Sequence, residues 1–205
     1  EVSPDRDWSL ISDCRRIHPQ PVGVPPELLD HYGTPAKVFH WLVVALLAIQ
    51  YPIGWLMPDL HRGMQPGAPM TFHLSVGLTI LIVVVLRLVW RLTHPVAPES
   101  KLPSWQRLSS EVVHWMLYAA VLATTLTGWL FASYRGWPVS FFYLFPIPML
   151  ASDNAAAGRA IDGLHQAAEW LLLGLIVVHV GSALLHVFVY RDQIMQRMLP
   201  GKPVG

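Results

Sequence analysis

Four long apolar segments constrain this 205-residue chain more than any other feature, because each is long enough to cross a lipid bilayer. A transmembrane helix needs about 20 residues to span roughly 30 Å of hydrocarbon. The predicted spans cover about residues 38–57, 70–92, 111–132 and 164–190. Only 13% of the residues are charged, against about 25% in soluble domains. We therefore expect an all-α membrane protein that folds as a four-helix transmembrane bundle.

Turn-forming residues set the predicted ends of these spans. Pro58 follows the first span, whereas Pro52 lies inside it and is expected to kink the helix rather than end it. Ser109 and Ser110 are a candidate N-cap for the third span. Residues 135–161 form the longest connection, and their apolar character predicts that they lie on the membrane surface or cover a cofactor.

The placement of basic residues predicts the orientation in the membrane. All but three of the 14 lysines and arginines lie on the side that holds both ends of the chain, the exceptions being Arg62, Arg135 and Arg159. Basic residues favour the cytoplasmic side, so both termini are expected to be cytoplasmic. Residues 1–33 are polar and proline-rich and are predicted to be a cytoplasmic arm, either disordered or ordered against a partner subunit. Residues 34–200 would form the transmembrane domain, and 201–205 a short tail.

Charge and cysteine content exclude several classes of protein. The formal net charge of +1 argues against a nucleic-acid partner, which requires a clustered basic surface. The single cysteine, Cys14, excludes an internal disulfide and any cysteine-rich zinc or iron–sulfur site. No C-x-x-C-H motif occurs, so haem cannot be attached covalently through that motif.

Four histidines lie inside or at the edges of the apolar segments: His40, His73, His165 and His179. Ionisable side chains are costly in hydrocarbon and usually have a function there. Paired imidazoles from facing helices are one way in which a protein holds haem iron. His165 and His179 are 14 residues apart, which is about 21 Å along an α-helix and within about 40° of the same face. One helix would therefore present two ligands at two depths.

The partners of these two histidines must lie at matching depths. His73 opens the second span from the outer side and matches His165, whereas His40 opens the first span from the inner side and matches His179. This predicts two b-type haems, each held by two histidines. Depth alone does not separate His179 from His186, seven residues further along nearly the same face, and His114 is a weaker rival.

The order of several short motifs resembles the bacterial cytochrome b561 family over roughly residues 33–200. These motifs are KVFHW, TFHLSVG, the R-x-x-x-R exit at Arg87 and Arg91, and HxxxxWxxxGxxxxHxxxxxxH in the fourth span. The resemblance implies a four-helix protein with two haem b groups, one between the histidines matching His40 and His179, the other between those matching His73 and His165. His186 resembles a family histidine near the quinone-binding inner region.

The same family includes small superoxide:ubiquinone oxidoreductases, which implies electron transfer from an outer, periplasmic donor such as superoxide to membrane ubiquinone. Arg135 is the candidate approach residue for an anionic donor, although a plain interfacial arginine would look the same. The alternative is a cytochrome b electron-transfer or anchor subunit of a larger dehydrogenase or hydrogenase complex. The N-terminal arm is longer than in the smallest members of the family.

Overall fold

The computed structural model describes residues 33–57, 65–95, 103–192 and 194–199. Its four long helices are α2 (Thr34–Trp55), α3 (Ala68–Thr93), α4 (Ser104–Tyr134) and α5 (Ala155–Leu185), and α5 continues directly into a π-helical turn, η2 (His186–Tyr190). All four are long and apolar enough to cross a membrane, which confirms the predicted four-helix transmembrane architecture. The predicted arm up to residue 32 and the tail from residue 201 lie outside the described residues.

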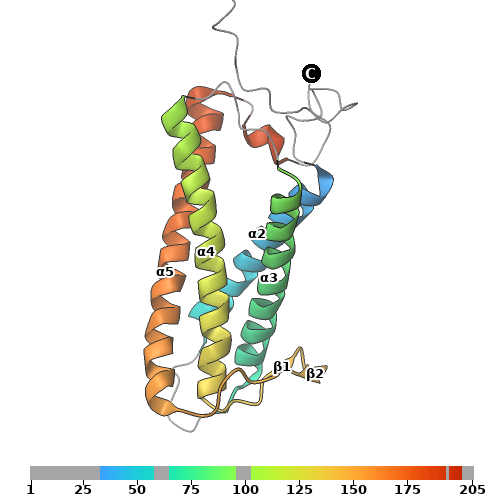
Figure 1. Cartoon of the computed structure of the whole chain (residues 1–205), viewed down its shortest axis with the longest axis vertical. Helices are drawn as coiled ribbons and strands as arrows, with labels where there is room; N and C mark the ends of the chain where they lie inside the picture. Colours follow the sequence, from blue (N-terminus) through green and yellow to red (C-terminus); the bar gives the residue numbers. More distant parts are fainter. Residues whose placement is uncertain (1–32, 58–64, 96–102, 193, 200–205) are drawn as a thin grey trace, which may run out of the picture.

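The helices run alternately up and down, so the bundle has two distinct ends (Figure 1). At the hairpin end, α2 and α4 finish, α3 and α5 begin, and a short β-hairpin connects α4 to α5. At the terminal end, α2 and α4 begin, and α3 and α5 finish. This alternation places the start of one helix beside the end of its neighbour. Histidines near the start of α2 or α3 can therefore lie at the same membrane depth as histidines of α5.

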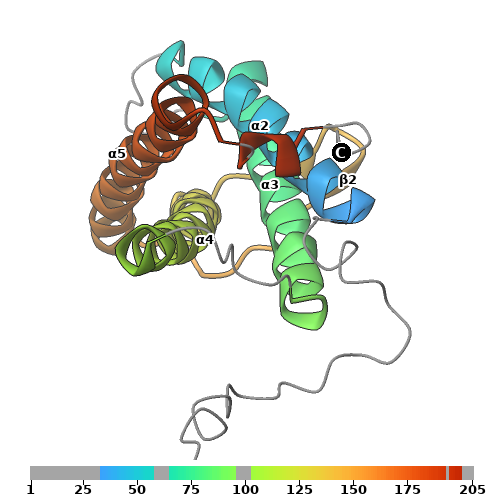
Figure 2. The ribbon, with the colours of Figure 1, turned by 90° about the horizontal axis from the view of Figure 1, so that it is seen from above.

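The bundle is closed on three sides and more open on the fourth. α2 packs on α3, α3 on α4 and α4 on α5, whereas no comparably close packing joins α2 to α5 within the described residues. Figure 2, seen from above, shows α2 and α3 standing apart from α4 and α5. Ile80 and Val84 of α3 and Leu172 of α5 are buried in the apolar core.

Two predicted helix details have different outcomes. α2 continues through Pro52 to Trp55, so the proline does not end the helix. The predicted N-cap at Ser109 and Ser110 is wrong, because α4 already begins at Ser104 after Pro103 and contains both serines. The polar segment ahead of the apolar residues is thus itself helical.

The connection after α4 is shorter and more ordered than the sequence predicted, because α5 begins at Ala155 rather than after residue 161. Its strands β1 (Ser140–Phe141) and β2 (Phe145–Pro146) pair in antiparallel fashion. Ser75 of α3 holds the hairpin, since its hydroxyl accepts the Phe142 N–H at 2.8 Å and donates to the Thr71 carbonyl at 2.7 Å. The hairpin is therefore fixed to the bundle.

Residues 191–192 and 194–199, which we call the C-terminal strap, lie across the terminal end between α5 and α2 (Figure 2). The Trp41 indole nitrogen donates to the Met198 carbonyl at 2.8 Å, and the Lys37 ammonium donates to the Leu199 carbonyl at 3.0 Å. Both donors lie on the first turns of α2. The strap therefore joins α5 to α2, two helices without close packing of their own within the described residues.

Candidate functional site

Two pairs of histidines face each other between the helices. His40 of α2 and His179 of α5 have ring centroids 6.2 Å apart, and His73 of α3 and His165 of α5 have centroids 6.4 Å apart. The first pair lies toward the terminal end and the second toward the hairpin end. These are the two pairs that depth in the sequence indicated, and α5 supplies one member of each.

The separation of each pair suits a shared metal. An imidazole nitrogen lies about 2 Å from a metal that it binds, and the ring centre lies roughly 1 Å further away. Two imidazoles on opposite sides of one metal therefore place their centroids about 6 Å apart. His114 also approaches His179, but their centroids are only 5.2 Å apart. The spacing thus favours His40 over His114 as the partner of His179.

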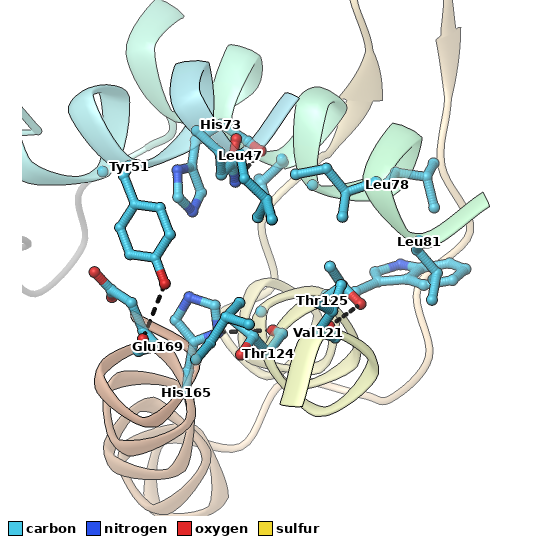
Figure 3. A pocket seen from close by; sticks show the side chains of 18 of the residues that line it. Leu47, Tyr51, His73, Leu78, Leu81, Val121, Thr124, Thr125, His165 and Glu169 are labelled. Carbon is cyan, nitrogen blue, oxygen red and sulfur yellow. Dashed lines mark hydrogen bonds between the residues drawn. The ribbon is translucent and has the colours of Figure 1, made fainter. Parts of the chain in front are cut away.

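An apolar cavity of about 780 Å³, including the space at its mouth, lies between His73 and His165. Their rings point toward one another across it (Figure 3). All four helices contribute to the lining, and so does the hairpin connection through Val139 and Ile147. The connection after α4 therefore covers part of this site, which is one of the two roles expected for it.

Three glycines make room around this cavity. A Cβ on Gly128 would lie 2.9 Å from Cε1 and 3.2 Å from Nδ1 of His165, too close for either group to stay in place. A Cβ on Gly54 would lie 3.4 Å from Cε1 of His73, and one on Gly77 would lie 3.4 Å from the Gln50 amide nitrogen. Gly54 and Gly128 were missed because each clears space for a histidine on another helix.

The backbone of α4 fixes the orientation of His165. Its Nδ1 lies 2.9 Å from the Thr124 carbonyl oxygen and 3.3 Å from the Thr127 hydroxyl. A carbonyl oxygen can only accept a hydrogen bond, so Nδ1 must carry the proton. In the neutral ring this leaves the lone pair on Nε2. Metal-binding histidines commonly use this arrangement, in which the second nitrogen donates to a carbonyl or carboxylate.

Two of the histidines carry orphaned ring nitrogens. Nδ1 of His40 and Nδ1 of His73 are buried and have no hydrogen-bond partner among the described residues. Such buried orphans are rare in folded proteins, so a bound group is expected to complete the site. Haem suits these residues, because its porphyrin leaves two axial positions for protein ligands. Nowhere in the described part of the chain do three or more His, Cys, Asp or Glu residues cluster as a bare metal ion would require.

The cavity also contains polar groups that the sequence analysis did not identify. Gln50 donates its side-chain amide to the His73 carbonyl at 3.0 Å, and the Tyr51 hydroxyl donates to the Glu169 carbonyl at 3.0 Å. The Tyr51 bond links α2 directly to α5 (Figure 3). Glu169 lines the cavity and is the only acidic residue between positions 164 and 190. That isolated charge was a signal available in the sequence, since ionisable residues in a span usually serve a function.

The two remaining candidate residues lie outside the histidine pairs. Arg135 caps the end of α4 at the hairpin end, with its guanidinium 4.9 Å from the centre of the Trp137 ring, and it does not line the cavity. His186 follows α5 at the terminal end, and its Nδ1 lies 2.6 Å from the Asp192 carboxylate. His186 is therefore held by Asp192, a residue that the sequence analysis had not considered.

Comparisons with known proteins agree with this geometry. The family model described as prokaryotic cytochrome b561 matches residues 31–201. Cytochrome b561 homolog 2 of Escherichia coli K12 is 31% identical over 175 residues, covering 83% of this chain and 92% of that protein. Cytochrome b561 homolog 1 of the same organism is 28% identical, covering 84% and 98%. A probable superoxide oxidase CybB of Yersinia pestis is 30% identical, covering 80% and 92%.

Substituting Gly128→Ala should displace the His165 ring, because the added methyl group would lie 2.9 Å from Cε1. If each histidine pair holds one haem, the haem at the hairpin end should be lost and the other kept, so the haem content should fall by about half. The haem-to-protein ratio and the reduced spectrum measure this. Gly174→Ala is the matched control, since a Cβ there meets nothing within 4 Å. Full haem content with an unshifted spectrum in Gly128→Ala would contradict the site.

Proposed function

This chain belongs to the prokaryotic cytochrome b561 family, and from that premise we propose that it is a di-haem oxidoreductase that passes electrons from superoxide to membrane ubiquinone. The observation that carries the proposal is the pair of facing histidine couples, 6.2 and 6.4 Å apart, joined by α5. His40 with His179, and His73 with His165, would each hold one haem b. When bound, each haem supplies a one-electron redox centre.

The residues of the chain set the conditions for that transfer. α5 spaces its two histidines about 21 Å apart along the helix axis, so one site lies toward each end of the bundle. The Thr124 carbonyl orients His165, and Gly54 and Gly128 let the rings of His73 and His165 approach their neighbours. Apolar residues keep water away from the cavity, which favours electron transfer over side reactions with solvent.

Superoxide would enter at the hairpin end, which faces the periplasm if both termini are cytoplasmic. Arg135 lies at that end and is partly exposed, and a cation at a site mouth raises the local concentration of an anion. The Yersinia pestis relative is named as a probable superoxide oxidase, which supports this choice of donor. The excess of lysine and arginine on the side that holds both termini supports cytoplasmic termini and the placement in a bacterial inner membrane.

Ubiquinone would be reduced at the terminal end, beside His40 and His179. His186 lies about 10 Å beyond His179 along α5, between that pair and the membrane surface. A quinone carbonyl needs a hydrogen-bond donor and finally a proton, and histidine can exchange protons near neutral pH. We therefore place His186 at the quinone, as the resemblance implied.

A second candidate function is an electron-transfer subunit of a larger dehydrogenase or hydrogenase complex. The observation that favours it is the length of chain ahead of α2: the family match begins at residue 31, so about 30 residues precede the shared domain. Such a polar, proline-rich arm suits a segment that orders against a partner subunit. The donor would then be a redox partner rather than superoxide.

The axial ligands are tested by replacing the histidines one at a time. His73→Ala or His165→Ala should remove the haem at the hairpin end and spare the other, whereas His40→Ala or His179→Ala should do the reverse. A b-type haem has no covalent tether, so loss of one ligand removes much of its binding. Haem content and spectra of the purified variants measure this, with exposed His94→Ala as control. Loss of a haem in His114→Ala, with retention in His40→Ala, would overturn the pairing.

The electron donor is tested by mixing the oxidised, purified chain with superoxide and then adding a soluble ubiquinone. We expect rapid haem reduction by superoxide alone, followed by reoxidation by the quinone. Arg135→Gln should slow the reduction several-fold at low salt and less at high salt, because the attraction is electrostatic. Arg159→Gln, an exposed cation in α5 at the same end, is the control. Haems that are reduced only when a co-purifying subunit is present would favour the second function.

The quinone contact is tested with His186→Ala. This variant should keep both haems and their spectra, because His186 is a ligand of neither. Its haems should still be reduced by superoxide but be reoxidised by quinone about 100-fold more slowly, the usual order of loss when a proton donor is removed. Stopped-flow absorbance at the haem α-band follows both steps. Unchanged reoxidation would place the quinone elsewhere.

A further inference from the structure

The shortest side-chain contact at the terminal end joins His186 to Asp192. His186 Nδ1 lies 2.6 Å from Asp192 Oδ2, and the two side chains are 13% and 31% exposed. The imidazole is thus nearly enclosed, while the carboxylate reaches partly into solvent. On the other side the ring lies against Tyr190, with centroids 5.1 Å apart. Such a short contact to a carboxylate is typical of a charge-assisted hydrogen bond.

The backbone takes unusual conformations to build this pair. α5 ends in the π-helical turn η2, and Arg191 follows with φ 52°, in the left-handed region. Only then does the chain reverse, so that the Asp192 N–H donates to the His186 carbonyl at 3.2 Å. A non-glycine residue in that region costs on the order of 1 kcal/mol. π-helical turns and strained residues both occur preferentially at functional sites.

The strap holds Asp192 from its other side. Asp192 Oδ1 accepts the N–H of Ile194 at 3.2 Å, so each carboxylate oxygen has a separate partner. Further along, the strap is tied to α2 through Met198 and Leu199. Asp192 therefore cannot rotate away from His186 without releasing the start of the strap. The carboxylate is fixed before any ligand arrives.

We propose that Asp192 is the positioning residue that makes His186 the proton donor for the quinone, an inference that rests on the function proposed above. The carboxylate accepts the Nδ1 hydrogen and fixes the ring plane. Nε2 on the far side of the ring then carries the hydrogen that a quinone oxygen can accept. This is the carboxylate–histidine arrangement that orients catalytic and metal-binding imidazoles in other proteins.

The reaction balances with the groups named. Two superoxide ions each lose one electron and become dioxygen, and the two electrons reach the quinone through the proposed haem pair. For each electron, the N–H bond at His186 Nε2 breaks and an O–H bond forms on a quinone oxygen. The ring then regains a proton from water at the exposed side of the Asp192 pair. One quinone thus takes up two electrons and two protons and leaves as quinol.

A purely structural role for the contact makes a different prediction. If Asp192 only ties the strap to α5, its loss should loosen the terminal end, lower haem retention there and alter quinone binding. If it acts through His186, haem content and quinone affinity should persist while turnover falls. Asp192→Asn separates the two, because its amide oxygen can still accept the Ile194 N–H that ties the strap, whereas its NH2 group cannot accept the His186 Nδ1 hydrogen and the negative charge is gone.

The experiment measures quinone-driven reoxidation in the full-length, haem-loaded protein for Asp192→Asn, Asp192→Ala and the control Asp162→Asn, an acidic residue at the opposite end of α5. We expect unchanged haem content and unchanged reduction by superoxide in Asp192→Asn. Its kcat for quinone should fall about tenfold with little change in KM, the usual size of effect when a partner of a functional histidine is lost. Asp162→Asn should behave like the unmodified protein.

A double variant decides whether Asp192 acts through His186. Adding Asp192→Asn to His186→Ala should slow reoxidation no further, because two residues that work as a unit are not additive. Three results would each overturn the inference. They are additive losses of reoxidation rate in the double variant, a full reoxidation rate in Asp192→Asn, and a loss of haem content without any other effect. If His186→Ala slows the reaction while both Asp192 variants do not, only this inference fails. If His186→Ala has no effect, the quinone assignment fails with it.

Discussion

The structure depends on one constraint: in hydrocarbon, every backbone N–H and C=O must be bonded within the protein, which makes the spans helical. The backbone groups of a helix are bonded to one another, so only its side chains can bind a ligand. Side chains lie on the same face of a helix only at regular intervals along the chain. Two ligands on one helix must therefore be separated by whole turns, as His165 and His179 are. That spacing sets the positions of both sites, and the neighbouring helices need only bring one histidine each to the right depth. The open side between α2 and α5 is the space this arrangement leaves.

The sequence predicted these parts well because they depend on local periodicity and length. Four apolar segments gave four helices, and alternate crossing of the membrane brought His40 opposite His179 and His73 opposite His165. The sequence could not choose between His179, His186 and His114 by depth. The structure adds geometry that depth does not contain and that favours the proposed pairing: His186 contacts Asp192, and the ring centroids of His114 and His179 are only 5.2 Å apart.

The features that could not be predicted from the sequence depend on contacts between helices or on turns of the backbone. The sequence does not distinguish Gly128 from other small residues of a transmembrane helix, because its close approach to His165 depends on how α5 packs against α4. The sequence does not mark Asp192 as functional, because it is the left-handed backbone conformation of Arg191 that reverses the chain there. The β-hairpin was missed because its two strands have only two residues each, too few to show a pattern. The N-cap was misplaced because the polar start of α4 has no apolar periodicity, although it is helical.

The position of α5 in the chain has a consequence for how the protein is made. α5 leaves the ribosome after α2, α3 and α4, and it carries one histidine of each facing pair. During synthesis, α2 and α3 therefore stand in the membrane with half of each pair and nothing opposite. The strap that joins α5 to α2 is made later still. A group held by both members of a pair could accordingly be inserted only once α5 has been made, and a chain cut short before α5 would leave His40 and His73 without their facing histidines.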